Sequence, residues 1–196
     1  MTRARDLANI ADGDITGTLT LDGLTVAGNV SVDSGTVKLD GNYPTGTNNV
    51  ALGDQALDDG SLSGSNLTAI GHVALTANTS GSSNTAVGSN ASTANTTGAD
   101  NVAMGVSALG SNTTGSSNTA FGRSALVSNT TASNNTAVGY QAMEANTTGA
   151  VNTAFGQQAL KANTTAFNNS AFGSAALYAN TTGQYNTGIG AQALAS

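Results

Sequence analysis

Cysteine and tryptophan are absent from the 196 residues, and proline occurs once. Without cysteine the chain can form neither a disulfide framework nor a thiolate metal site or nucleophile. Charged residues make up 8%, with five Lys or Arg against eleven Asp or Glu. This composition lacks the basic patch that binds nucleic acid. No apolar run reaches the roughly 18 residues of a membrane span, so we expect neither nucleic-acid binding nor membrane insertion.

Catalytic chemistry has few candidate residues. The single histidine, His72, follows a glycine at a position where other copies of the repeat described below carry Asp54 or Ser89. Such variation is typical of a solvated surface position. Asp58 and Asp59 form the only adjacent acidic pair, which a solvated loop explains. We therefore predict no catalytic residue, no metal ligand and no cofactor, and a protein that is not an enzyme.

One pentapeptide organises the chain. It reads Asn84-Thr85-Ala86-Val87-Gly88, and variants of it close on nine glycines. The first interval between these glycines is 18 residues and the other seven are 17. A fixed period of this kind indicates a repeat architecture. The glycines are Gly53, Gly71, Gly88, Gly105, Gly122, Gly139, Gly156, Gly173 and Gly190.

Each copy contains two short strand-like pieces. The first, Thr-Ala-Val-Gly or a variant, ends at the glycine, and the second, Ala-Leu-x-Ala, begins three residues after it. Glycine and asparagine turn chemistry separates the pieces, and we expect the recurring Asn residues to form turn ladders. Seventeen residues are too few for helical repeats, which need about 33. The sequence therefore predicts an all-β parallel β-roll, or β-solenoid, of nine ~17-residue coils over residues 45–196.

Strand alternation predicts which columns of residues face inward. We expect the apolar residue before each glycine, the Leu four residues after it and the Ala six residues after it to share a thin interior. The alanine two residues before the glycine then points outward, where a bare alanine stripe suits the close approach of another strand. We predict an interface between copies of the chain through this stripe, and alanine that merely suits a tight coil is the alternative. The stripe comprises Ala51, Ala69, Ala86, Ala103, Ala120, Ala137, Ala154 and Ala171.

Two segments precede the repeats. Residues 14–44 alternate apolar and polar residues between closely spaced glycines, which predicts a short β-rich neck. In residues 1–13, one or two amphipathic turns would form a docking peptide that becomes ordered on a partner. A frayed terminus is the alternative. The candidate attachment residues are Arg3, Arg5, Leu7 and Ile10.

Two of the copies carry a family resemblance. Residues 135–143 and 152–160 read Asn-Thr-Ala-Val-Gly-Tyr-Gln-Ala-Met and Asn-Thr-Ala-Phe-Gly-Gln-Gln-Ala-Leu. They resemble the head repeats of YadA-like trimeric adhesins and, more closely, the longer-period version in bacteriophage tail fibres, notably those of cyanophages. The resemblance covers residues 45–196 and implies a left-handed parallel β-roll that forms a homotrimer. The opening, residues 2–19, resembles the start of phage tail proteins.

The bacterial adhesins carry a secretion signal and a C-terminal membrane anchor, and the sequence shows neither. We therefore expect a structural phage tail fibre on the exterior of the virion. It would attach to other tail or virion proteins through its N-terminus and display the roll for host-cell adsorption. A capsid or neck fibre, or a spacer without receptor binding, is the first alternative. An ice-binding solenoid is the second, because Thr79 and its equivalents recur at coil spacing.

Positions that vary between coils would carry receptor specificity. Tyr140, Phe167, Tyr178 and Tyr185 occupy such positions, all in the last four coils. Exposed aromatic rings offer a stacking face to sugars, so these four are the candidate contacts to a host surface polysaccharide. Aromatic residues that cover roll edges or pack between subunits are the alternative.

Overall fold

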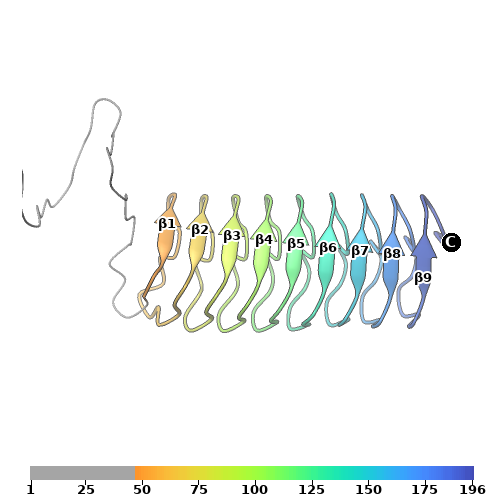
Figure 1. The fold of residues 1–196 in the computed structure, drawn as a ribbon. Helices are drawn as coiled ribbons and strands as arrows, with labels where there is room; N and C mark the ends of the chain where they lie inside the picture. The colour runs from red at the N-terminus through yellow and green to blue at the C-terminus, as the bar shows by residue number, and fades with distance from the viewer. Residues whose placement is uncertain (1–46) are drawn as a thin grey trace, which may run out of the picture. The chain divides into compact units, whose positions relative to one another are not determined.

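The computed structural model describes residues 47–196, which form nine short strands and no helix. The strands pair in chain order into one parallel sheet, and the coils stack along one direction (Figure 1). This confirms the predicted all-β parallel solenoid. The neck (14–44) and the attachment peptide with Arg3, Arg5, Leu7 and Ile10 lie outside the described residues. The strands are β1 (Val50–Leu52), β2 (Thr68–Ile70), β3 (Thr85–Val87), β4 (Val102–Met104), β5 (Thr119–Phe121), β6 (Thr136–Val138), β7 (Thr153–Phe155), β8 (Ser170–Phe172) and β9 (Thr187–Ile189).

The strand register follows the sequence period. Ala86 of β3 pairs with Ala103 of β4, and Ala137 of β6 pairs with Ala154 of β7. Paired strands lie about 4.8 Å apart, so each position of the repeat becomes a column of equivalent side chains. Below, a coil is named by its strand and includes the chain that follows that strand up to the next one.

The glycine that ends each strand is required by the backbone. All nine have φ between +115° and +137°, a region that other residues rarely adopt. The next coil also comes very close: a Cβ built on Gly139 would lie 2.5 Å from the carbonyl oxygen of Gly156. Glycine is therefore repeated because the coils touch through their backbones at this column.

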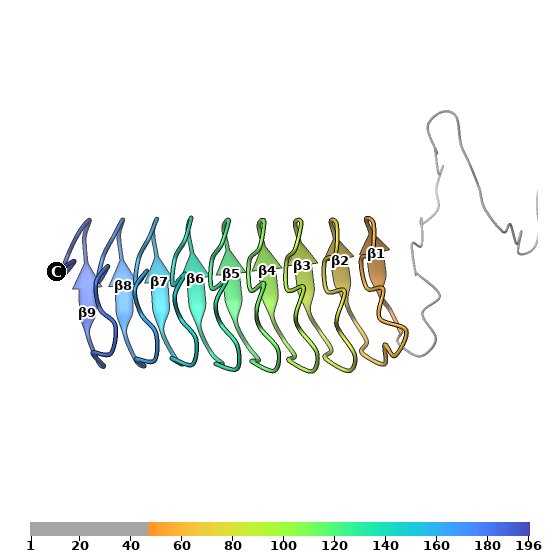
Figure 2. The same cartoon turned by 180° about the vertical axis from the view of Figure 1, so that it is seen from behind.

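The prediction that Ala-Leu-x-Ala forms a second strand is wrong. This stretch forms turns, with left-handed backbone at Gln141 (φ +54°) and Met143 (φ +52°) in the coil of β6 and at equivalent residues in the other coils. A strand needs extended backbone angles at every residue. Leucine and methionine seldom adopt positive φ, so their presence gave no signal of the turn. Figure 2 shows the side of the stack on which each coil closes through irregular chain.

The core is narrow and is filled by small residues and, in seven of the nine coils, by a Leu or Met four residues after the glycine; Ser92 takes this position in the coil of β3, and Leu194 in the coil of β9 is exposed. In the coil of β6 the core residues are Ala137 of the strand, Ala142 and Met143, all fully buried. The buried Leu or Met four residues after the glycine agrees with the prediction. The alanines six residues after the glycine, such as Ala145, are half-buried or, at Ala179, exposed, so they do not belong to the core as predicted.

The predicted orientation of the strands is wrong. The alanine of each strand points into its own coil, and the larger apolar residue before the glycine points outward. Side chains alternate between the two faces of a strand, so a prediction that places one column on the wrong face also places the neighbouring column on the wrong face. Alanine is buried because the coil is too narrow there for a larger residue beside Leu or Met, so this column is not available as an interface. Ala69, Ala86, Ala103, Ala120, Ala137, Ala154 and Ala171 are buried, and Ala51 is half-buried.

Two buried columns of asparagine complete the interior. In the first, Asn146 Nδ2 donates to Asn129 Oδ1 of the previous coil at 2.9 Å and to the carbonyl oxygen of Gly149 at 2.9 Å. In the second, the backbone N–H of Asn152 donates to Asn135 Oδ1 at 3.0 Å. Every buried side-chain nitrogen and oxygen in residues 47–196 has a partner. The predicted turn bonds are present, but these asparagines also link coil to coil, and this hydrogen bonding offsets the cost of burying amides.

Candidate interaction surface

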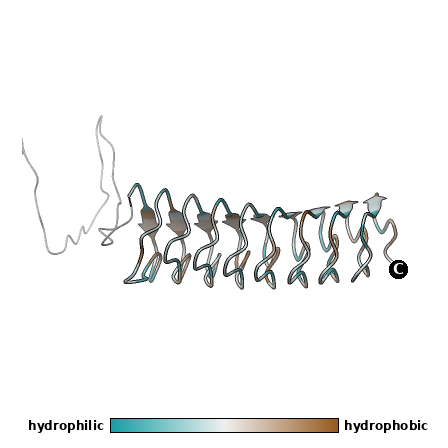
Figure 3. Ribbon diagram, turned by 90° about the horizontal axis from the view of Figure 1, so that it is seen from below, coloured by the Kyte–Doolittle hydropathy of each residue, from teal (hydrophilic) through white to brown (hydrophobic). Residues whose placement is uncertain are grey.

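The outward face of the sheet carries a continuous column of large apolar side chains, here called the outer stripe. It consists of the residue before each conserved glycine, and every coil contributes one. Six of its members are exposed, for example Leu52 at 54%, Phe121 at 51% and Ile189 at 74%, and Val87, Met104 and Val138 are partly exposed. Figure 3 shows the strands along one side of the stack and the connections along the other. The outer stripe comprises Leu52, Ile70, Val87, Met104, Phe121, Val138, Phe155, Phe172 and Ile189.

Two neighbouring members of the outer stripe pack against each other. The rings of Phe155 and Phe172 stack with centroids 5.9 Å apart and planes 14° from parallel. Beside the stripe, the first residue of each strand also faces outward and is mostly Thr, with Val at Val50 and Val102. Neither column contains a charged residue. The sheet face is therefore an uncharged strip that is apolar along one edge and bears hydroxyls along the other.

By its size, this strip is a candidate interaction surface. Nine strands about 4.8 Å apart, each three residues or about 10 Å long, give a face on the order of 400 Å². The largest apolar patch on a typical soluble monomer is about 300–600 Å² and is often functional. The large side chains of the outer stripe are therefore placed where a partner could cover them.

Charged side chains lie outside this strip. His72 Nε2 lies 3.7 Å from Asp54 Oδ2 in the column that directly follows the glycines, and the side chains are 58% and 76% exposed. The exposed surface position predicted for His72 is confirmed. Ion pairs with this exposure contribute little to stability. Among residues 47–196, no group of three His, Asp or Glu side chains could hold a metal ion.

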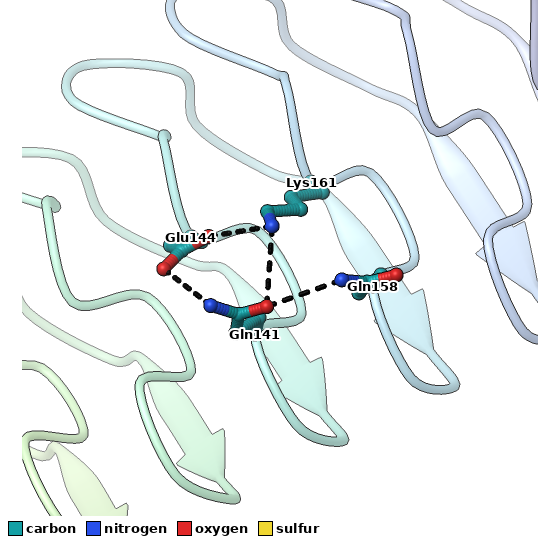
Figure 4. Close-up of polar contacts among 4 residues, drawn as sticks. All are labelled: Gln141, Glu144, Gln158 and Lys161. Carbon is teal, nitrogen blue, oxygen red and sulfur yellow. Dashed lines mark hydrogen bonds and ion pairs between the residues drawn. The ribbon is translucent and has the colours of Figure 1, made fainter.

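A polar cluster links the turns of two neighbouring coils (Figure 4). Gln141 Nε2 donates to Glu144 Oε1 at 2.8 Å in the coil of β6. From the coil of β7, Gln158 Nε2 and Lys161 Nζ both donate to Gln141 Oε1 at 3.1 Å. Lys161 Nζ also lies 3.2 Å from Glu144 Oε2. These groups pair with one another, so the cluster ties two turns together and leaves no charge aimed at a ligand.

The four predicted sugar-facing aromatics do not form one patch. Phe167 and Tyr185 meet edge to face, with ring centroids 5.5 Å apart and planes at 82°. Tyr140 directly follows Gly139, and Tyr178 lies five residues after its glycine, so these two rings occupy other columns of the coil. All three tyrosines are exposed. The structure brings together only Phe167 and Tyr185.

The threonine column considered for ice binding is used inside the stack. Thr96 Oγ1 donates to the carbonyl oxygen of Thr113 at 3.0 Å, and Thr147 Oγ1 donates to that of Thr164 at 3.1 Å. Other members of the column make the same bond. Their hydroxyl hydrogens therefore link coils and are not offered to a surface ligand.

The sequence predicts no segment that could cross a membrane as a helix. Over residues 47–196, no helix has the length and apolar character needed to cross a bilayer.

Comparison of the chain with protein-family models, with curated proteins and with solved structures gave no match.

Proposed function

We propose that this chain is a structural fibre protein that assembles as a homotrimer through its outer stripe. The observation that carries the proposal is the run of outward-facing large apolar residues over all nine coils, from Leu52 to Ile189, six of them exposed and three partly exposed. Apolar surface of this extent on a soluble protein favours association, because covering it removes apolar area from water. The interface predicted at the buried alanines thereby moves to the opposite face of the same strands.

The partner that suits the outer stripe best is another copy of the chain. Its side chains recur at the spacing of parallel strands over nine coils, and a second copy presents the same column at the same spacing. Closed symmetric assemblies of identical chains are the usual form of soluble oligomers. The number three comes from the resemblance to YadA-like trimeric heads and phage tail fibres.

The proposed role is that of a tail fibre on the exterior of a phage particle. Its N-terminal segment would attach to other virion proteins, and the stacked coils would be displayed toward the host cell. The resemblance of residues 45–196 to tail-fibre repeats and of residues 2–19 to the start of phage tail proteins supports this role. A capsid fibre or passive spacer would use the same outer stripe without binding a receptor.

Sedimentation equilibrium of the full chain tests the assembly. We expect the mass of three chains for the natural sequence. The double variant Phe155→Asp/Phe172→Asp places two carboxylates in the outer stripe and should give monomers with an unchanged far-UV circular dichroism spectrum. The matched control, Thr148→Asp/Thr165→Asp, changes exposed residues of another column and should remain trimeric. A monomeric natural chain, or a trimer that tolerates both stripe carboxylates, would contradict the proposal.

Adsorption tests the biological role. If the trimer carries the receptor-binding surface, an excess of the purified protein should compete with phage particles for host cells and slow their adsorption several-fold. Electron microscopy of particles labelled with an antibody to the chain should place the label on tail fibres. Label confined to the capsid would favour the capsid-fibre alternative, and label on the tail without competition would favour the spacer.

A further inference from the structure

The two positions that precede the second asparagine column hold small or polar residues in most coils. They are Ser82 and Ser83, Ala99 and Asp100, Ser116 and Ser117, and Ser133 and Asn134 in four successive coils. The coils of β6, β7 and β8 depart from this rule, because Val151 takes the second position in the first of them, Phe167 the first position in the next and Tyr185 the second position in the last. The rings of Phe167 and Tyr185 meet edge to face at 5.5 Å.

Tyr185 has an unfavourable backbone conformation for its residue type. Its φ is +59°, in the left-handed region, where Asn, Asp and Ser fill most other coils at the equivalent position. A bulky residue rarely adopts this conformation. Leu57 and its equivalents up to Leu177 are buried at positive φ, but Tyr185 is 72% exposed, and so is Val151 at the equivalent position (φ +59°, 51% exposed). The coil geometry therefore imposes this conformation on every copy of the column, and a large residue placed there keeps its side chain on the surface.

Hydrogen bonds to the neighbouring coil hold the backbone that carries the Tyr185 ring. Its backbone N–H donates to the carbonyl oxygen of Phe167 at 3.3 Å, which joins the two coils beneath the rings. The next residue, Asn186, donates its N–H to Asn169 Oδ1 at 2.9 Å, and Asn169 Nδ2 donates to the carbonyl oxygen of Gly183 at 2.8 Å. The asparagine column thus fixes the chain on one side of Tyr185, and Phe167 supports its ring.

The surroundings of this ring pair are polar but uncharged. Exposed hydroxyls and amides stand in the same two coils, at Thr165, Asn168, Thr182 and Gln184. Residues 162–196 contain no Asp, Glu, Lys, Arg or His. Such a surface gives no electrostatic attraction to phosphate or to an acidic polymer. It matches a neutral ligand that has an apolar face and a rim of hydroxyls.

We propose that Tyr185, supported by Phe167, is a stacking subsite for a neutral pyranose of a host surface glycan. The C–H bonds on one face of a pyranose ring carry a small positive charge and pack against the negative face of an aromatic ring. Tyrosine supplies such a contact with little loss of side-chain entropy. The hydroxyl and amide side chains of the two coils bind the sugar hydroxyls. This assignment rests on the proposed role in host adsorption and narrows the four aromatic candidates to one pair.

Saturation-transfer difference NMR on the full chain tests the subsite. The chain has only four Tyr and four Phe and no Trp, so irradiation of aromatic protons saturates few rings. The probes are methyl β-D-galactopyranoside, methyl β-D-glucopyranoside and methyl α-D-mannopyranoside, each at millimolar concentration. We expect transfer to the ring C–H protons of at least one of them, reduced at least fivefold in Tyr185→Ala and retained in Tyr185→Phe.

Tyr178→Ala is the matched control, because Tyr178 is an exposed tyrosine of the same region in another column. This variant should keep the signal of the natural chain. Absence of transfer to all three sugars, or equal transfer in Tyr185→Ala and the natural chain, would overturn the subsite. A changed oligomeric mass of Tyr185→Ala in sedimentation equilibrium would overturn it too, because the ring would then pack between chains. A monomeric natural chain would contradict the proposed trimer while leaving the sugar test valid.

Discussion

Asn146 Nδ2 donates to Asn129 Oδ1 across 2.9 Å, and both side chains are completely buried. The same bond recurs between successive coils from Asn78 to Asn180, with distances of 2.8 to 3.3 Å. A buried amide without partners is costly, so the column is stable only when the coils are stacked in register. This column therefore makes the correct register of the solenoid energetically distinct from a shifted one.

Removing one rung of this column should destabilise the stack. Asn129→Ala leaves Asn112 Oδ1, Asn146 Nδ2 and the carbonyl oxygen of Ala132 each with one hydrogen bond fewer. Asn146 Nδ2 and the Ala132 carbonyl each keep one other partner, so Asn112 Oδ1 bears most of the loss. A buried polar group left without a partner costs about 1–3 kcal/mol, and we expect the free energy of unfolding to fall by about that amount. Urea unfolding followed by circular dichroism measures it. Thr131→Ala, an exposed change in the same coil, should stay within about 0.5 kcal/mol.

The glycine column should not tolerate a side chain. Gly139→Ala adds a Cβ within 2.5 Å of the next coil's backbone at φ +135°, and two coils would have to separate. We expect a loss of more than about 3 kcal/mol or failure to fold, since this exceeds ordinary overpacking. Gly60→Ala is the control, because its added Cβ would meet nothing within 4 Å. Equal unfolding midpoints for the two variants would show that the backbone contact is not needed.

The orientation of the strands can be tested with neighbouring residues. Ala137 is fully buried and Val138 faces outward with partial exposure. Ala137→Leu should lower the free energy of unfolding by about 1–3 kcal/mol or more, because the narrow core has no room for the added carbons. Val138→Leu should leave the fold intact and keep the unfolding midpoint within the error of the measurement. If Val138→Leu destabilised the fold and Ala137→Leu did not, the orientation predicted from the sequence would be the correct one.

The ion pair between Lys161 and Glu144 should contribute little to the free energy of unfolding. Lys161 and Glu144 approach to 3.2 Å, with side chains 24% and 28% exposed. A double-mutant cycle of Lys161→Met and Glu144→Gln should give a coupling energy of about 0.3–1 kcal/mol, which falls when the salt concentration is raised to about 1 M. Thermal unfolding of the four proteins provides the cycle. A salt-independent coupling well above this range would identify the cluster as a major stabilising element.

One signal in the sequence could have shown the strand orientation. The strand alanine stays alanine in eight coils, while the residue before the glycine ranges from Val87 to Phe121. A packed interior does not accept such differences in volume at constant backbone spacing. Invariant small size therefore indicated the inside and variable large size the outside. The usual expectation that the larger apolar residue is buried pointed to the opposite assignment.

The sequence by itself determined the number of coils, their parallel order and the glycine at each strand end. These follow from local rules, because a 17-residue period with turn residues at fixed offsets allows little else. Only the tertiary structure decided which face of the strand is inside, that Leu160 and its equivalents adopt left-handed backbone, and that Phe167 meets Tyr185. Each of these depends on the width of the closed coil or on contacts between coils. Such contacts form only when successive coils have folded against one another.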